Sequence, residues 1–419
     1  MKESKTSFIR WSALVIASLT MFGCYYLYDS VAYVSIEMEK MIGFTDQQFG
    51  MFYSAYSLAA IAVLFFSGIF VDKFGTRLSI LIFGVICTIA GIMAALSHSL
   101  VLMLVSRLVL GFGSEPLIVA VTVAIAKWFK GRTLGFALGV NLLIARLGSW
   151  VVDWSPTWGG KFYNGTYQSP LILAAVIGMF CIAGGIGYYI IEKYAETNQM
   201  LGKHADTDKL ELKGILKFNR SFWYILILCV TFYSAIFPFR AFAPKFFEES
   251  QGISKALAGR FNSWLPTMAM FATPLIGLLI DKIGKRASMM FLGSFLLVPV
   301  FLMMGYTHIT LYVPVLMMGV AFSLIPAIMW PSVAYIVDEK RLGKAYSLMM
   351  LIQQAGVMFF SWLIGWANDY SGASANHPQG YNLGMWLFSV LGISALVFSL
   401  LLRKEETGPN SHGLEKTRI

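Results

Sequence analysis

Two stretches of ten residues decide how this chain is built: Gly-Ile-Phe-Val-Asp-Lys-Phe-Gly-Thr-Arg at 68–77 and Gly-Leu-Leu-Ile-Asp-Lys-Ile-Gly-Lys-Arg at 277–286. They share the pattern G-x-x-x-D-K-x-G-x-R and are offset by 209 residues (277 − 68), about half of the 419-residue chain. A repeat at a fixed spacing indicates a duplicated structural unit. Because each copy follows one long apolar run and precedes another, the repeat predicts two halves with the same order of elements.

The composition around these stretches predicts a membrane protein. Hydrophobic residues make up 57% of the chain and charged residues 13%, whereas soluble domains are about 25% charged. The apolar runs are about twenty residues long, enough for a helix to cross a hydrocarbon core of about 30 Å. We therefore predict an all-α membrane protein with twelve transmembrane helices, the first near 11–34 and the last near 382–402. A soluble enzyme, a disordered chain and a single-anchor protein are excluded, and so is an outer-membrane β-barrel, whose strands alternate in polarity.

The repeat and the charges together predict the organisation of the domains. We expect two pseudo-symmetric six-helix bundles at 1–192 and 221–403, a cytoplasmic linker at 193–220 and a cytoplasmic tail at 404–419. Most of the 32 Lys and Arg residues fall in the tails and in the loops on one side of the membrane, and basic loops mark the cytoplasmic face. Both termini are therefore predicted to be cytoplasmic. The net charge of +10 is a topology signal, so no nucleic-acid partner is expected.

Residues typical of enzymes and metal sites are few or wrongly placed. Cys24, Cys87, Cys181 and Cys229 each lie inside an apolar run without paired spacing, so we interpret them as packing residues. All five histidines fall in loops or tails, where they cannot form a membrane-embedded proton relay or metal centre. The sequence has no phosphate-binding loop of the G-x-x-x-x-G-K-[ST] type and no nucleophile with a base at a recognisable spacing. We expect no enzymatic activity, no cofactor and no metal.

The repeated motif, together with the number of spans, resembles the cytoplasmic signature loop of the major facilitator superfamily, over the entire chain. The resemblance implies two six-helix halves with a substrate site near the membrane midplane. It also implies that the loop latches the cytoplasmic side, with its acidic residue facing the N-terminal end of a helix from the other half. The alternative is that these charges only set the topology. The residues that match the latch are Asp72, Lys73, Arg77, Asp281, Lys282 and Arg286.

A narrower resemblance lies in five strings. They are RLVLGFGSEPLIVA (107–120), KWFKGRTLGFALGVNLLIARLGS (127–149), IFPF (236–239), FNSW (261–264) and MWPSVAYIVDEKRLGKAYSLM (329–349). These strings look like those of the lysosomal dipeptide transporters of this superfamily, which act as uniporters, and of their bacterial relatives. The resemblance implies that Glu115 and Arg146 contact the substrate. The chain departs from it at Arg240, which follows IFPF where an apolar residue is expected.

The depth of Glu115 and Arg146 in the membrane points to the same residues independently. Glu115 precedes Lys127 by 12 residues and Arg146 follows Arg132 by 14, which places them ~18 and ~21 Å along their helices from one cytoplasmic loop. An ionised group at that depth costs about 2.5–3.5 kcal/mol unless it faces water or a partner. Opposite charges at one level suit a zwitterion, since the carboxylate can bind an ammonium and the guanidinium a carboxylate. The alternative is a permanent salt bridge between the two helices.

Further intramembrane residues are weaker candidates. Asp29 could meet an amine or could be a wetted residue near a helix end, and Arg240 could bind a carboxylate or could extend to the outer interface. Arg107 resembles a signature associated with proton coupling, but Leu110 stands where that signature has glutamine, so a structural role is equally favoured. The polar-tipped or aromatic candidates for substrate pockets are Tyr56, Tyr233, Asn262, Trp264, Trp330 and Gln353.

These observations lead to one functional hypothesis with two alternatives. We predict an alternating-access uniporter that binds a dipeptide or another zwitterion at the midplane and works as a monomer in the lipid bilayer of a bacterial inner membrane. The first alternative is a carrier of organic anions or amino acids, with or without proton coupling, in which the arginine matters and the glutamate is dispensable. The second is a membrane sensor that binds a ligand without transporting it.

Overall fold

The computed structural model describes residues 2–129, 133–198, 218–338, 341–409 and 411–416, with side chains from residue 7 onward. The described part of the chain is helical, and its only β contact is an isolated bridge between Ser374 and His377. It divides into two compact units. Unit 1 contains the described residues up to 198 except 44–54, and unit 2 contains 44–54 together with the described residues from 218 onward.

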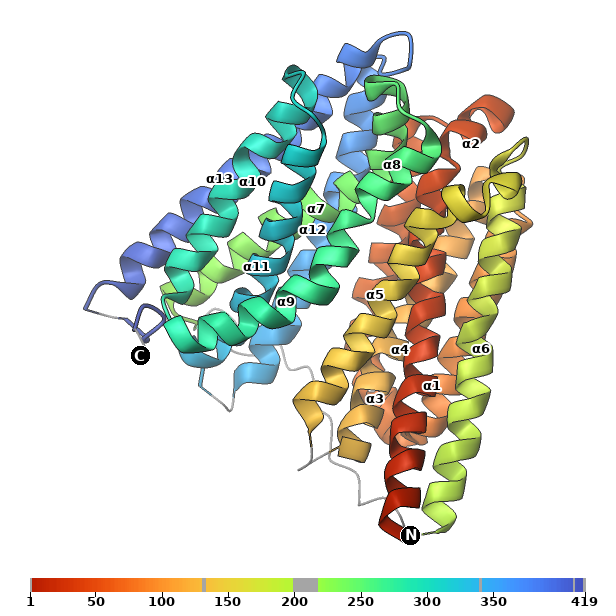
Figure 1. Ribbon diagram of the computed structural model, residues 1–419, viewed down its shortest axis with the longest axis vertical. Coiled ribbons are helices and arrows are strands. Elements are labelled where there is room, and N and C mark those ends of the chain that lie inside the picture. The colour runs from red at the N-terminus through yellow and green to blue at the C-terminus, as the bar shows by residue number, and fades with distance from the viewer. Residues whose placement is uncertain (1, 130–132, 199–217, 339–340, 410, 417–419) are drawn as a thin grey trace. The chain divides into compact units, whose positions relative to one another are not determined.

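Unit 1 is built from long apolar helices joined by short connections. Its elements are α1 (Lys2–Ser30), η1 (Val31–Tyr33), α2 (Ser35–Ile42), α3 (Asp46–Ala95, which begins in unit 2), α4 (Leu100–Phe129), α5 (Leu134–Trp158), η2 (Gly160–Tyr163) and α6 (Gln168–Thr197). Helix α1 packs against α5 and α6 (Figure 1). The packing is close, since a Cβ atom added at Gly148 of α5 would lie 2.3 Å from the carbonyl oxygen of Phe22. Small residues allow this approach of two helix backbones in a membrane.

Helix α3 contains two membrane crossings. Its 50 residues would extend ~75 Å as one straight helix, more than twice the thickness of a bilayer core of about 30 Å. Gly75, the glycine of the first signature copy, interrupts it with φ 76° and ψ 164°. The matching glycine of the second copy, Gly284, has φ 73° and ends α9. Positive φ costs glycine least, so the repeated glycine turns the chain between consecutive crossings in both copies. Eleven of the described helices are long and apolar enough to span a membrane, and with α3 counted twice they give twelve crossings.

Unit 2 contains the second set of long helices. Its elements are α7 (Arg220–Gln251), α8 (Lys255–Asn262), α9 (Trp264–Ile283), α10 (Arg286–Tyr306), α11 (Tyr312–Ile336), α12 (Leu342–Tyr370), η5 (Pro378–Tyr381) and α13 (Asn382–Glu406). Helix α10 packs between α11 and α13, and α7 packs against α12 and α13 (Figure 1). The predicted all-α membrane fold is confirmed. The predicted linker at 193–220 is bordered by the ends of α6 and α7, but its middle, 199–217, lies outside the described residues.

The four cysteines are buried free thiols in the helix packing. Cys24, Cys87 and Cys181 belong to the core of unit 1, where the Cys181 thiol donates to the Thr20 carbonyl at 3.3 Å. Cys229 lies on α7 and donates to Gln353 Oε1 at 3.8 Å. Their placement matches the interpretation as packing residues.

Candidate functional site

The predicted residues Glu115 and Tyr56 meet where α4 and α3 face each other within unit 1. Glu115 and Arg146 are both half-buried, and the Tyr56 hydroxyl from α3 donates to Glu115 Oε1 at 3.0 Å. The same hydroxyl forms a hydrogen bond with Ser114 Oγ. Pro116 follows directly and has no N–H, so the helix backbone next to the carboxylate lacks one of its regular hydrogen bonds. The structure therefore brings two of the predicted residues, Tyr56 and Glu115, into direct contact.

Arg146 on α5 lies over an aromatic ring of α1. Its guanidinium carbon is 5.3 Å from the centroid of the Tyr25 ring, a cation–π contact worth about 0.5–2 kcal/mol depending on its solvation. One turn further along α1, the Tyr28 ring packs edge-on against Tyr56, with ring centroids 4.6 Å apart. A tyrosine of α3 therefore contacts Glu115, and a tyrosine of α1 contacts Arg146. Asp29 follows Tyr28 and is half-buried near the end of α1.

Unit 2 carries three of the aromatic and amide candidates on α7, α11 and α12. The indole N–H of Trp330 donates to the Tyr233 hydroxyl at 3.0 Å, and Tyr233 stacks on Phe237 with centroids 5.5 Å apart. Gln353 is half-buried on α12 and accepts from Cys229 of α7. The Tyr346 hydroxyl fixes the other side of Trp330 by donating to its carbonyl oxygen at 3.1 Å. Three of the predicted residues, Tyr233, Trp330 and Gln353, are therefore carried on neighbouring elements of one unit.

The structure gives Asn262 a role in supporting the backbone. Pro244 inside α7 has no N–H, so it cannot supply the regular helical hydrogen bond to the carbonyl oxygen of Arg240, four residues earlier. Asn262, at the end of α8, donates its Nδ2 to that carbonyl at 3.4 Å. Arg240 is 4% exposed and Asn262 3% exposed. The FNSW string therefore supplies the donor that Pro244 removes. Trp264 begins α9 two residues later and is 36% exposed.

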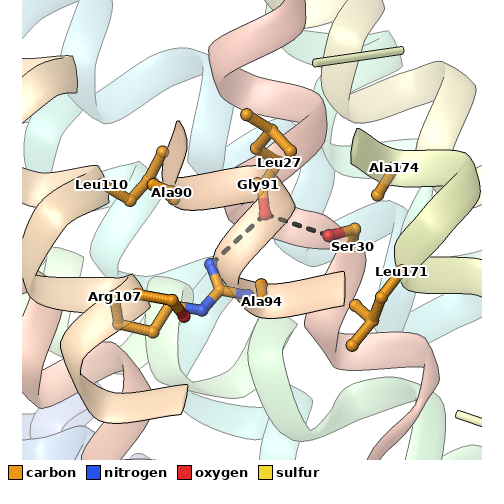
Figure 2. A pocket seen from close by; sticks show the side chains of 10 residues that line it. Leu27, Ser30, Ala90, Gly91, Ala94, Arg107, Leu110, Leu171 and Ala174 are labelled. Atoms are coloured by element: carbon orange, nitrogen blue, oxygen red, sulfur yellow. Dashed lines mark hydrogen bonds between the residues drawn. The ribbon is translucent and has the colours of Figure 1, made fainter. Parts of the chain in front are cut away.

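Arg107 also supports the backbone. Its Nη1 donates to the Leu27 carbonyl at 3.2 Å, and the Ser30 hydroxyl donates to the same carbonyl at 3.0 Å (Figure 2). The same Nη1 also donates to the Tyr28 carbonyl at 3.2 Å. These carbonyls belong to the last turn of α1, where a cation is favourable. Leu27, Ser30 and Arg107 line a cavity of about 10 Å³, which is room for about one water molecule. It is too small for a peptide.

The signature loop of unit 1 takes part in a charge network formed by the turn within α3 and the ends of α4 and α6. Arg77 Nη1 lies 2.8 Å from Glu196 Oε2, and Lys127 Nζ lies 2.6 Å from Glu192 Oε1. Thr76 donates to the same Glu192 oxygen at 2.7 Å. Glu192 is fully buried, and we did not predict it. Its place at the polar end of a predicted span was the signal available in the sequence.

The second signature loop is held differently. Arg286 Nη2 lies 2.6 Å from Asp281 Oδ1, and the guanidinium carbon of Arg286 is 4.9 Å from the centroid of the Tyr335 ring. Arg286 is buried, whereas the Asp281 side chain is 66% exposed. Of the six residues that match the latch, Asp72, Lys73, Asp281 and Lys282 are exposed, whereas Arg77 is half-buried and Arg286 is buried. The latch between halves stays a prediction.

Sequence reasoning missed a second buried cluster, within unit 2 at the start of α3. Lys245 Nζ lies 2.6 Å from Asp46 Oδ1, with both side chains at most 5% exposed, and Asn368 donates to Asp46 Oδ2 at 2.8 Å. Asp369 accepts from the backbone N–H groups of Asp46 and Gln47 at 2.9 and 2.8 Å. Asp46 opens a helix, so from the sequence it resembles an ordinary capping residue. Its partners are about 200 and 320 residues away, and no local pattern indicates them.

Asp153 on α5 is another acidic residue that sequence reasoning missed. It is fully buried and accepts from the Tyr33 hydroxyl at 2.6 Å. An acidic residue inside an apolar run is the signal that could have identified it. The bond ties α5 to the η1 turn that follows α1.

A chain with twelve apolar crossings, a repeated loop after the second crossing of each half and half-buried charged side chains inside its long apolar helices has the features of a polytopic membrane transporter. The family model described as Major Facilitator Superfamily matches residues 14–270 and 261–418. The chain belongs to the major facilitator superfamily. It is a transporter and not an enzyme.

Named relatives and a solved structure agree with this assignment. The chain is 31% identical to the lysosomal dipeptide transporter MFSD1 of Danio rerio, over 86% of this chain and 80% of the relative. It is 28% identical to the protein of the same name from Bos taurus, over 94% of this chain and 85% of the relative. The crystal structure of the nucleoside transporter NupG matches with a TM-score of 0.72 at 14% identity, covering 93% of this chain and 98% of that one. The NupG match supports the fold alone.

Proposed function

We propose that this protein is a dipeptide uniporter that binds the peptide through Glu115 and Arg146. The observation that carries the proposal is that Tyr56 holds the Glu115 carboxylate and Tyr25 faces the Arg146 guanidinium, while both charged side chains stay half-buried within membrane-spanning helices. A carboxylate can accept the N-terminal ammonium of a peptide, and a guanidinium can bind a carboxylate through two parallel hydrogen bonds. The relatives named as dipeptide transporters support the same substrate class.

The second unit supplies aromatic and amide groups suited to peptide side chains and to the peptide bond. Tyr233 and Trp330 are joined by a hydrogen bond, which orients the two rings. Gln353 carries both a donor and an acceptor on its side-chain amide, as the peptide bond does. We assign these three residues to the recognition of the uncharged part of the substrate.

The mode of transport that we propose is alternating access by the two six-helix halves, without a coupled proton. Arg107 supports this mode, because the arginine of the element associated with proton coupling is engaged with the end of α1. Uptake of a dipeptide into proteoliposomes should have the same initial rate with and without an imposed pH gradient. A rate that follows the gradient would replace the uniporter by a proton-coupled carrier.

The substrate assignment is tested with two variants and their controls. Glu115→Gln and Arg146→Ala should each abolish dipeptide uptake into proteoliposomes, while Glu405→Gln and Lys404→Ala, at the end of α13, should transport normally. If only Arg146→Ala fails, the protein is a carrier of organic anions or amino acids. If dipeptides stabilise the purified protein against heat but no flux is found, the sensor hypothesis replaces the transporter.

The proposed location is a bacterial cell membrane with both termini in the cytoplasm, and the proposed working form is a monomer. The excess of Lys and Arg in alternate loops supports the orientation, whereas the relatives are named as lysosomal proteins. Single cysteines placed at Ser411 and at Asn164 in a chain without its native cysteines would test it. An impermeant thiol reagent should label position 411 only in inside-out vesicles and position 164 only in right-side-out vesicles.

A further inference from the structure

The polar segment after α13 is folded against unit 2. Residues 412–415, here called the strap, form neither helix nor strand, yet the Leu414 side chain is 1% exposed. Backbone and side-chain groups of the strap form hydrogen bonds with α7, α10 and α13. These contacts indicate that the strap holds the ends of several helices of unit 2 together.

One set of contacts surrounds the carboxylate of Glu406, at the end of α13. Glu406 is 2% exposed and accepts from Ser221 Oγ at 2.7 Å. The strap supplies three further donors: the His412 backbone N–H at 2.9 Å, the His412 ring Nδ1 at 2.8 Å and the Leu414 backbone N–H at 3.4 Å. A buried carboxylate is costly unless it is hydrogen-bonded, and most of its donors here come from the strap.

The hydrogen bonds assign the tautomer of His412. Asn219 caps α7 by accepting from the Phe222 N–H through Oδ1 at 2.9 Å, which leaves its Nδ2 to face the Ile336 carbonyl and His412 Nε2, each at 2.9 Å. An amide NH₂ group only donates, so His412 Nε2 accepts and the ring proton is on Nδ1, pointing at Glu406. The imidazole thus joins the start of α7 to the end of α13 as one donor and one acceptor.

The second set of contacts caps α10, where the second signature copy ends. The preceding residue, Lys285, provides no side-chain cap, and the first N–H groups of a helix have no partner within it. The Leu414 carbonyl accepts from the Arg286 N–H at 2.7 Å. The Glu415 carboxylate accepts from the Ser288 N–H at 2.6 Å and from the Ser288 hydroxyl at 2.8 Å. The strap therefore supplies the N-terminal cap of α10.

In unit 1, the corresponding buried carboxylate is stabilised by a salt bridge. Glu192, near the end of the last helix of unit 1, is buried like Glu406 and is bound directly by Lys127 of α4 and Thr76 of α3. The repeat offset of 209 residues pairs Lys127 with Ile336 in the second half. Isoleucine is uncharged, so it cannot form the same salt bridge. The end of α13 therefore has a buried carboxylate without the lysine that its counterpart uses.

We propose that the strap is a detachable cytoplasmic clamp that replaces in unit 2 the lysine salt bridge of unit 1. It joins the start of α7, the start of α10 and the end of α13, so that these three helices move together, and it holds the end of the second signature loop in place. Helix α13 ends at Glu406, and the strap beyond it is anchored to the helices by hydrogen bonds and by the buried Leu414, which is why it can be released. The clamp depends on unit 2 alone, so it is independent of the substrate that the protein carries.

The test compares a chain that ends at Gly408 with the full chain. Without the strap, the amide hydrogens at Arg286 and Ser288 should exchange about tenfold faster or more, because their opening no longer breaks the cap. The purified protein should also melt at a temperature lower by about 2–4 °C or more, and initial uptake should be slower. Ser411→Ala and Lys416→Ala, which change exposed neighbours of the strap, should match the full chain in all three measurements. Unchanged exchange at 286–288 in the shortened chain would overturn the proposal.

Substitutions at His412 keep the proposal testable if the shortened chain does not fold. Glutamine can replace the imidazole as one donor and one acceptor, whereas leucine offers neither. His412→Gln should therefore keep slow exchange at 286–288 and His412→Leu should lose it. Equal behaviour of the two variants would reject the role given to the ring. Failure of these measurements would leave dipeptide uptake by the full chain unaffected, so it can be told apart from failure of the proposed function.

Discussion

The Tyr56 hydroxyl donates a hydrogen bond to Glu115 Oε1 at 3.0 Å, which holds a carboxylate of α4 by a side chain of α3. The Tyr56 ring is itself held edge-on by Tyr28 of α1. Three helices of unit 1 therefore orient one acidic group before any substrate binds. A binding group that is oriented in advance loses less freedom on binding, which favours affinity.

The first prediction concerns that hydrogen bond. Tyr56→Phe removes the hydroxyl and keeps the ring, so the carboxylate should remain in place but less well oriented. A hydrogen bond to a charged group is worth about 1.5–3 kcal/mol, so the KM for dipeptide uptake should rise about tenfold or more. Tyr194→Phe, at an exposed ring on α6, serves as the control. An unchanged KM in Tyr56→Phe would mean that Tyr56 does not orient the binding carboxylate.

The second prediction is that Glu115 binds the N-terminal ammonium of the dipeptide. In the parent protein, N-acetylation of a dipeptide removes the ammonium and should weaken binding strongly. In Glu115→Gln the same acetylation should matter little, because the partner charge is already gone. Inhibition of labelled dipeptide binding to the purified protein by the two peptides gives the four affinities needed. Additive effects of mutation and acetylation would place the ammonium elsewhere.

The third prediction is that Arg146 binds the C-terminal carboxylate of the dipeptide. Arg146→Lys keeps the positive charge but loses the planar fork that binds a carboxylate through two hydrogen bonds. Dipeptide affinity should fall, and converting the substrate carboxylate to an amide should cost less affinity in the variant than in the parent. Competition binding again measures both. Full activity of Arg146→Lys would show that charge alone is sufficient.

The fourth prediction tests the support that Asn262 gives to α7. Asn262→Leu removes the donor to the Arg240 carbonyl and should lower the free energy of unfolding by about 1–3 kcal/mol. Adding Pro244→Ala restores a backbone N–H to the same carbonyl, so the double variant should recover part of the loss. Thermal unfolding of the purified variants measures the effect. No recovery in the double variant would assign Asn262 a different task, such as contact with substrate.

The fifth prediction concerns the buried ion pair of unit 2. Asp46→Asn leaves the Lys245 ammonium buried beside a neutral amide, and removal of one partner of a buried pair costs about 3–5 kcal/mol. Lys245→Met in the Asp46→Asn background removes the uncompensated charge and should restore much of the stability. Melting temperatures of the single and double variants provide the comparison. A double variant less stable than Asp46→Asn would show that Lys245 stabilises the unit through other contacts.

Membrane crossing, duplication and the two central charges follow from the sequence by itself. The length of the apolar runs, the offset of 209 residues between the copies of the motif and the distance of Glu115 and Arg146 from the loop ends are properties of composition and spacing along the chain. A helix has a fixed rise per residue, so depth in the membrane can be counted from the sequence.

Only the tertiary structure decided which side chains meet at a given depth. Tyr56 and Glu115 are 59 residues apart, Lys127 and Glu192 are 65, and Asp46 and Lys245 are 199. The rotation of each helix about its own axis and the close approach of neighbouring helices determine such contacts, and neither can be counted along the chain. The same holds for the strap at 412–415, which resembles a polar tail in the sequence because its partners at 219, 286, 288 and 406 are brought together only when the helices of unit 2 pack.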